Sequence, residues 1–181
     1  SRHIERFRRV RVRLLANDFW PGLMHAIIFW GFVVLTIGTV EFFGRGVVES
    51  FVLPLLSDTP HYLVLQDLFS TLVIVAVRYA LFRRLVSRPK RLNFSTEALV
   101  ILLLIVGLMV TDLLADAAHM RLVPEPHNHW QFAGSAIAQA LAGLSPTAVQ
   151  VVFHLAWWAH AALLLGFLVL LPYSKHLHIL V

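Results

Sequence analysis

TEALVILLLIVGLMVTDLLADAA, residues 96–118, is the stretch that decides the fold. It is apolar without interruption from Ala98 to Val110, and a helix needs about 20 such residues to cross the hydrocarbon core of a bilayer. Three more runs of comparable length follow the same pattern, at residues 21–43, 62–82 and 147–172. The sequence therefore predicts an all-α fold, a membrane bundle of four transmembrane helices.

The overall composition supports a membrane protein. Of 181 residues, 59% are hydrophobic and 14% are charged, and the mean hydropathy is +0.76. These values argue against a soluble single domain. Cysteine is absent from the sequence, which excludes disulfides, cysteine-ligated clusters and covalent haem attachment within it. A bound metal would depend on histidine, carboxylate or a non-covalent cofactor.

Basic residues are distributed asymmetrically about the four runs. Twelve of the 15 fall at residues 2–13, at residues 83–91 or at Lys175, all on one predicted side. Arg45 and Arg121 fall on the other side, and Arg78 lies within the second run. Because cytoplasmic loops are enriched in Lys and Arg, both termini are expected to be cytoplasmic in a multi-pass protein of the bacterial cell membrane. Basic residues that flank apolar runs give no reason to expect nucleic-acid binding.

Local signals predict where helices begin. Asn17 and Asp18, with Pro21 shortly after, form a helix-start signature before the first run. In the loop between the third and fourth runs, residues 131–144 are expected to form a short helix at the outer surface.

Histidines inside or beside the apolar runs are the first candidates for function, because ionisable groups in a membrane span are costly. His25 lies about one turn into the first run, and His160 lies near the middle of the fourth. His178 follows His160 by 18 residues, which on a continuous helix places both rings on one face roughly 27 Å apart. Imidazoles from two helices at one depth suit a six-coordinate haem b. From spacing alone, the alternative to haem ligation for His25 is a packed polar residue. For His154 it is an aromatic-belt residue near the outer face.

Two segments carry a family resemblance. HAALLLGFLVLLPYSKHLHI, residues 160–179, and FWPGLMHAIIFWGFVVLTIGTVEFFG, residues 19–44, resemble the gamma subunit of respiratory nitrate reductase, a cytochrome b. The resemblance implies that His160 and His178 are haem ligands and that His25 pairs with His178. The phrases HAIIFWGF, GTVEFF and PYSKHLHI are still more similar to the membrane region of heterodisulfide-reductase-like iron-sulfur oxidoreductases. These include proteins that pass electrons between electron-transfer flavoprotein and menaquinone.

The sequence departs from the nitrate reductase pattern in the partner of His160. The family supplies that ligand 10 residues after the one matched by His25, and Leu35 stands there. His119 is the first alternative, with His154 and His61 behind it; a five-coordinate haem or no second haem also stays open. The chain has four runs where the nitrate reductase subunit has five spans. Heterodisulfide-reductase-like proteins continue past SKHLHI into a cytoplasmic domain, so the sequence is expected to be a fragment, a trimmed chain or a membrane domain alone.

Acidic residues gather toward the predicted outer side. Asp67, Asp112 and Asp116 lie there with His119, and Asp112 and Asp116 are one turn apart. We interpret them as a quinone site with a proton path, since quinol oxidation releases protons. The alternative is that they are helix-end residues in contact with solvent. Arg78 is expected either to pair with haem propionates or to extend to the cytoplasmic surface.

Together these observations predict one membrane cytochrome b domain over residues 1–181 with one or two haems b. Its expected role is the electron-transfer part of a quinone oxidoreductase in a respiratory chain. Menaquinone would be the substrate, and a cytoplasmic iron-sulfur domain or electron-transfer flavoprotein the partner. Two alternatives remain: a haem-free membrane anchor for a redox partner, and a small proton or metal transport protein.

Overall fold

The computed structural model describes residues 2–47, 53, 59–87, 96–124 and 128–173. Within them every regular element is helical, with no strand. The α-helices are α1 (Arg2–Val47), α2 (Pro60–Phe82), α3 (Thr96–Leu122), α4 (Phe132–Ala140) and α5 (Pro146–Tyr173). Three short turns adjoin them: the π-helical η1 (Arg83–Ser87) and the 3₁₀ turns η2 (Asn128–Trp130) and η3 (Leu141–Gly143).

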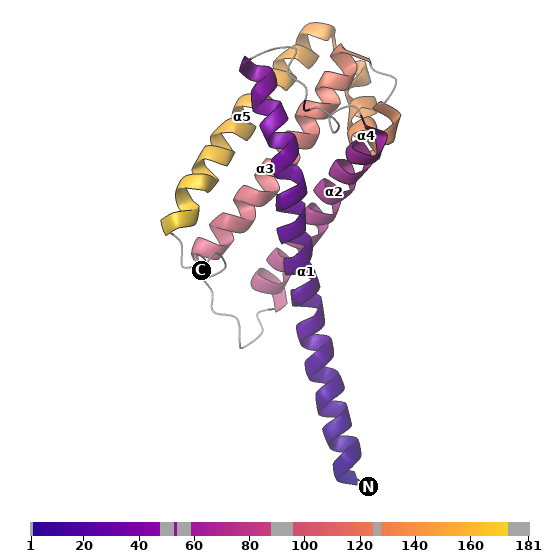
Figure 1. Cartoon of the computed structure of the whole chain (residues 1–181), viewed down its shortest axis with the longest axis vertical. Helices are drawn as coiled ribbons and strands as arrows, with labels where there is room; N and C mark the ends of the chain where they lie inside the picture. Colours follow the sequence, from indigo (N-terminus) through magenta and orange to yellow (C-terminus); the bar gives the residue numbers. More distant parts are fainter. Residues whose placement is uncertain (1, 48–52, 54–58, 88–95, 125–127, 174–181) are drawn as a thin grey trace.

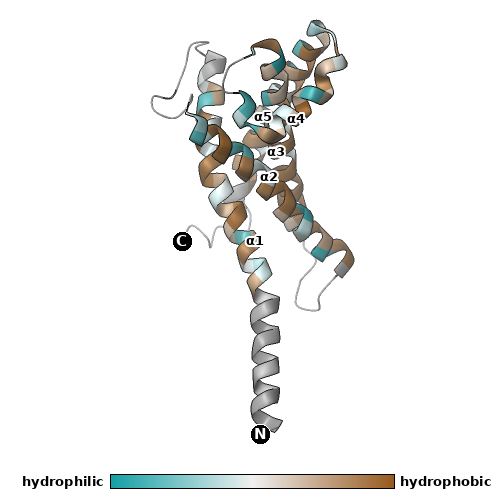
Figure 2. Ribbon diagram, turned by 90° about the vertical axis from the view of Figure 1, so that its right-hand side faces the viewer, coloured by the Kyte–Doolittle hydropathy of each residue, from teal (hydrophilic) through white to brown (hydrophobic). Residues whose placement is uncertain are grey.

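Four helices are long and apolar enough to cross a membrane, which confirms the predicted fold class. The spanning stretches are Phe19–Gly44, Pro60–Val86, Thr96–Leu122 and Pro146–Leu170. Hydrophobic residues cover most of these helices (Figure 2). Many large apolar side chains remain exposed on the molecule, as expected for a surface that faces lipid. The short helix expected near residues 131–144 is present as α4 and η3.

The helices form an up-and-down bundle (Figure 1). α2 packs against α1 and α3, and α3 packs against α5. The N-terminal half of α1 extends beyond the bundle, at the end where α5 finishes and α3 begins (Figure 1). The short α4 lies at the opposite end and packs against α3 and α2. The beginning of α1 and the end of α5 therefore share one end of the bundle.

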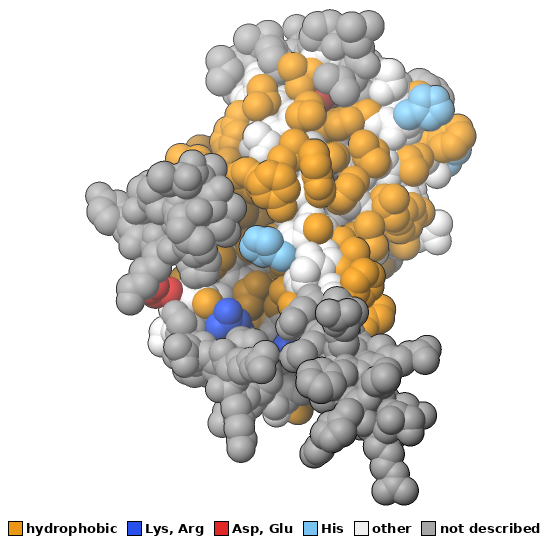
Figure 3. All heavy atoms as spheres, turned by 60° about the horizontal axis from the view of Figure 1, so that its bottom comes forward, with side chains coloured by type: hydrophobic (Ala, Val, Ile, Leu, Met, Phe, Trp, Pro, Cys, Tyr) orange, Lys and Arg blue, Asp and Glu red, His pale blue; other side chains and the backbone are white. Residues whose placement is uncertain are grey.

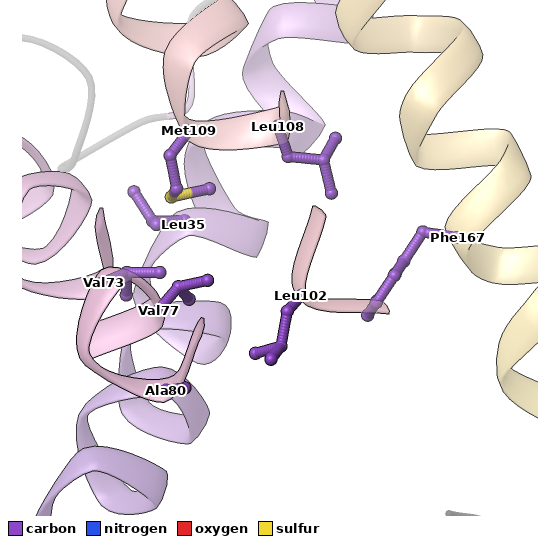
Figure 4. Packing of buried hydrophobic residues seen from close by; sticks show 8 residues of the cluster. All are labelled: Leu35, Val73, Val77, Ala80, Leu102, Leu108, Met109 and Phe167. Atoms are coloured by element: carbon purple, nitrogen blue, oxygen red, sulfur yellow. The ribbon is translucent and has the colours of Figure 1, made fainter. Parts of the chain in front are cut away.

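The hydrophobic core joins all four long helices. Its buried members are Leu35, Val73, Val77, Ala80, Leu102, Leu108, Met109 and Phe167 (Figure 4). Val73 lies so close to α1 that a Cβ placed on Gly31 would clash with a Val73 methyl group. Glycine at position 31 is thus what allows α1 and α2 to approach each other here.

The helix start expected at Asn17 and Asp18 is wrong, because α1 runs without a break from Arg2 through Pro21. Proline removes one backbone N–H donor from the helix. Ending a helix would release several backbone groups, and within a bilayer each would have to be satisfied elsewhere. A single interior proline is therefore the less costly arrangement. α5 likewise continues through Pro172, as far as Tyr173.

Candidate functional site

Among the predicted ligands that the structure describes, His160 is the most deeply buried, with 3% of the residue exposed. Its Nδ1 atom lies 3.2 Å from the carbonyl oxygen of Leu108 and 3.2 Å from Oγ1 of Thr111, both on α3. A carbonyl oxygen can only accept a hydrogen bond, so Nδ1 of the neutral ring carries the proton and donates it. The other nitrogen, Nε2, then carries the lone pair.

Nε2 of His160 is buried and has no hydrogen-bond partner among the described residues. Buried polar atoms nearly always have a partner, and an unpartnered one calls for an explanation. A neutral imidazole held through Nδ1–H, with Nε2 free, is the form in which histidine binds a metal. His160, in this environment, therefore fits the role of one axial ligand of a haem.

Aromatic side chains of α1 shield this imidazole. The Phe42 ring lies 5.0 Å from the His160 ring, and it stacks on Trp157 of α5 at 5.4 Å with an interplanar angle of 18°. Nearer the other end of the bundle, Phe32 of α1 lies 6.0 Å from Phe167 of α5. α1 and α5 therefore meet through rings, and His160 lies between an apolar aromatic wall and the polar backbone of α3.

His25 and His178 are the predicted pair of ligands at the end of the bundle that the sequence predicts to be cytoplasmic. His25 lies on an exposed part of α1, and His178 lies outside the described residues. Figure 3 views the molecule from that end and shows histidine side chains at a mostly hydrophobic surface, with few Lys or Arg side chains among the described residues. Arg78 is exposed on α2. The pairing of the two histidines and the role of Arg78 stay predictions.

The candidate partners of His160 lie at other levels. His119 is beside Phe153, with ring centroids 6.0 Å apart, and helix rise places it about 12 Å along α3 from Thr111. His154 is exposed on the same helix as His160 and projects about 120° away from it. His61 is exposed at the start of α2. None of the three is brought beside His160.

Leu35, at the position where the resembled family has a ligand, is buried with Leu108 and Phe167 in the core. Its side chain fills apolar space close to the segment of α3 that holds His160. Among the described residues, no group of three or more His, Cys, Asp or Glu side chains is placed to hold a metal ion.

Asp67 is 2% exposed and bonds the beginning of α4. Its Oδ2 accepts a hydrogen bond from the backbone N–H of Ala133 at 2.8 Å, and its Oδ1 accepts one from Gly134 at 3.0 Å. The first N–H groups of a helix have no partner within the helix. The carboxyl group of α2 therefore caps α4 from a distance in sequence, a role that its place in an apolar run did not indicate.

The other acidic residues belong to a polar layer that crosses three helices. Asp112 is buried and lies close to the side chain of Gln66 on α2. The Gln131 amide donates a hydrogen bond to Asp116 at 3.4 Å. Glu41 of α1 is 8% exposed and lies near Tyr62 of α2. Asp67 and Asp116 lie near Asp112 in the structure, whereas the role of these residues in a quinone site and proton path stays a prediction.

Four residues of this region were missed by sequence reasoning: Glu41, Tyr62, Gln66 and Thr111. Glu41 carried a signal, since it is a carboxylic acid within the first span. Tyr62 donates a hydrogen bond to the carbonyl of Val34 at 3.3 Å, which no sequence pattern indicates. Thr111 is one hydroxyl in an apolar run, and its relation to His160 depends on how α3 and α5 are rotated.

Two curated proteins are similar to the chain. The probable iron-sulfur-binding oxidoreductase FadF of Bacillus subtilis (strain 168) is 34% identical over 168 residues, covering 92% of this chain and 24% of that protein. The EtfAB:quinone oxidoreductase of Syntrophomonas wolfei is 27% identical over 177 residues, covering 87% of this chain and 23% of that protein. The chain thus spans about a quarter of the length of these relatives.

These similarities support an oxidoreductase-related family with a link to quinone and electron transport. They agree with the branch of the resemblance that joins iron-sulfur oxidoreductases to electron-transfer flavoprotein. The similarity to the nitrate reductase gamma subunit stays a prediction. No protein-family model matches the chain, and no solved structure matches it.

Proposed function

We propose that this chain is the membrane electron-transfer domain of an oxidoreductase and that it holds haem b. It would pass electrons between a menaquinone-type quinone pool and a cytoplasmic iron-sulfur or electron-transfer flavoprotein partner. The four apolar helices and the two oxidoreductase relatives, one of them named for a quinone, support this proposal.

The observation that carries the proposal is the state of His160. This histidine lies in the middle of an apolar span and is fixed through Nδ1 by Leu108 and Thr111. Its Nε2 is buried and has no partner within the described ranges. A histidine kept only for packing would be expected to have both nitrogens satisfied. A haem would account for this nitrogen, because its iron would bind Nε2.

His160 would hold one haem, and His25 with His178 would hold another nearer the cytoplasmic end. A bound haem b supplies reversible one-electron chemistry. The protein contributes the ligands, their orientation and an environment that excludes water. The aromatic wall of Phe42 and Trp157 keeps water away from the His160 ring.

The quinone would bind at the polar layer near α4. Asp112 and Asp116 would accept the protons of a quinol; the burial of Asp112 within the bundle and the contact of Asp116 with Gln131 before α4 support this role. Asp112→Asn should slow quinol oxidation about 100-fold or more with unchanged haem content, because general-base assistance typically contributes about 10²- to 10⁴-fold. An unchanged rate would move the quinone site elsewhere.

The haem-to-protein ratio and a reduced-minus-oxidised visible spectrum of the purified chain test the proposal. We expect a low-spin b-type spectrum in the wild type and loss of one component in His160→Ala. His154→Ala is the matched control, because it removes an exposed histidine from the same helix. A wild-type protein without haem would refute the cytochrome assignment and favour a haem-free anchor.

A further inference from the structure

The contact between Thr111 and His160 links a polar side chain of α3 to the buried imidazole of α5. Oγ1 of Thr111 lies 3.2 Å from Nδ1 of His160, and the ring is nearly inaccessible. The carbonyl of Leu108 lies at the same distance from Nδ1. The Nδ1–H group therefore faces two oxygen atoms, one fixed in the backbone and one on a side chain.

The hydroxyl of Thr111 is oriented by its own helix. Oγ1 lies 2.8 Å from the carbonyl oxygen of Gly107 and 3.0 Å from that of Leu108. A hydroxyl has one proton to donate, and both carbonyls can only accept. With the proton directed to the preceding turn, the oxygen presents its lone pairs to other donors. Towards His160, Thr111 is therefore an acceptor.

Close packing of α3 on α5 sets this geometry. A Cβ placed on Gly107 would come within 3.0 Å of a Leu163 methyl group, and Leu163 lies one turn after His160. The two helices thus approach each other over Gly107, which brings the Leu108 carbonyl and Thr111 within reach of the ring. The imidazole has little freedom to rotate away from these acceptors.

We propose, on the basis of the function proposed above, that Thr111 is a positioning residue for His160 and tunes the redox potential of the haem that His160 holds. An acceptor on Nδ1–H strengthens the imidazole as an electron donor to a metal. A stronger donor favours the oxidised metal, so hydrogen bonding of this kind is one way in which a protein lowers a haem potential. Of the two acceptors on Nδ1–H, the Leu108 carbonyl belongs to the backbone, so Thr111 is the acceptor that a side-chain substitution can remove.

Potentiometric titration of the full chain in detergent micelles tests this assignment. The haem component that disappears in His160→Ala identifies the potential to follow. Thr111→Val retains the branched shape and removes the acceptor. We expect the midpoint potential of that component to rise and its electron paramagnetic resonance signal to shift, with the haem-to-protein ratio unchanged. Thr111→Ser retains a hydroxyl and should restore values near those of the wild type.

Thr71→Val is the matched control, because Thr71 bonds a carbonyl one turn back on α2, that of Asp67, at 3.0 Å. It should leave the potential unchanged. Loss of the His160 haem in Thr111→Val, with retention in Thr111→Ser and Thr71→Val, would also support positioning by the hydroxyl. The assignment fails if Thr111→Val retains its haem at the wild-type potential, or if Thr71→Val produces the same change. A wild-type chain without haem would refute the proposed function and this inference with it.

Discussion

Replacing Asp67 with alanine removes the acceptor for two backbone N–H groups at the start of α4. Ala133 and Gly134 donate to the two carboxyl oxygens at 2.8 and 3.0 Å. The side chain lies on α2, in a part of the bundle that is almost fully buried. The substitution therefore leaves two donors without partners, in a place where water reaches them poorly.

The expected cost follows from these two hydrogen bonds. Leaving a buried donor unsatisfied costs about 1–3 kcal/mol, and losing a helix cap costs about 0.5–2 kcal/mol. We take about 2–3 kcal/mol for the pair, close to the lower limit for two orphaned donors, because relaxation of α4 relieves part of the loss. Since every 1.4 kcal/mol is a factor of ten, opening of α4 should become roughly 30- to 150-fold more frequent.

Hydrogen–deuterium exchange of the detergent-solubilised protein measures this opening directly, because amide exchange reports local unfolding. Peptides covering α4 should exchange faster by that factor in Asp67→Ala. Asp67→Asn retains one carbonyl acceptor and should show an intermediate effect of about 5- to 12-fold, which corresponds to the loss of one bond. Peptides from the middle of α5, to which Asp67 makes no capping hydrogen bond, serve as the internal reference.

Unchanged exchange of α4 in Asp67→Ala would refute the capping role. Equal acceleration in α4 and α5 would also contradict it, because the carboxyl group would then stabilise the bundle as a whole. An effect confined to α4 would show that Asp67 has a structural role, whatever part it plays in a proton path.

Three further predictions concern ligands, packing and topology. His25→Ala and His178→Ala should each remove the same low-spin haem component while the protein still inserts; normal haem content in both would exclude this pair. Gly31→Ala should lower the midpoint of thermal denaturation, since overpacking costs about 1–3 kcal/mol, whereas Gly22→Ala should not, because a Cβ there meets no atom within 4 Å. In sealed vesicles, protease should cut the basic segment 83–91 from the cytoplasmic side; cleavage only from the outer side would reverse the orientation.

The fold class was predictable because its information is local. Each of the four apolar runs is long enough to span a bilayer by itself, and a backbone in lipid must satisfy its own hydrogen bonds as a helix. The structure moved the predicted boundaries by only a few residues, except at Pro21, where a local stop signal was overridden. Sequence rules treat a proline after Asn and Asp as a helix start, whatever surrounds it. In this protein α1 is helical on both sides of Pro21.

The candidate site was predictable only in part. His160 stood out as an ionisable residue in the middle of a span, and the clustering of Asp112 and Asp116 followed from one turn of helix. The residues that these side chains contact could not be predicted from the sequence. Thr111 and Gln66 are ordinary polar residues in sequence, and they become relevant through contacts with His160 and Asp112 on other helices.

The sequence by itself thus determined how many helices are long and apolar enough to cross a membrane, and which residues are too polar for their surroundings. The tertiary structure decided which polar groups meet. Contacts between helices depend on axial register and rotation, and a shift of one residue turns a side chain by about 100°. That rotation directs Nδ1 of His160 to Thr111 and leaves Nε2 without a partner in the part of the chain that the structure describes. It also joins Asp67 to α4 across more than 60 residues of sequence.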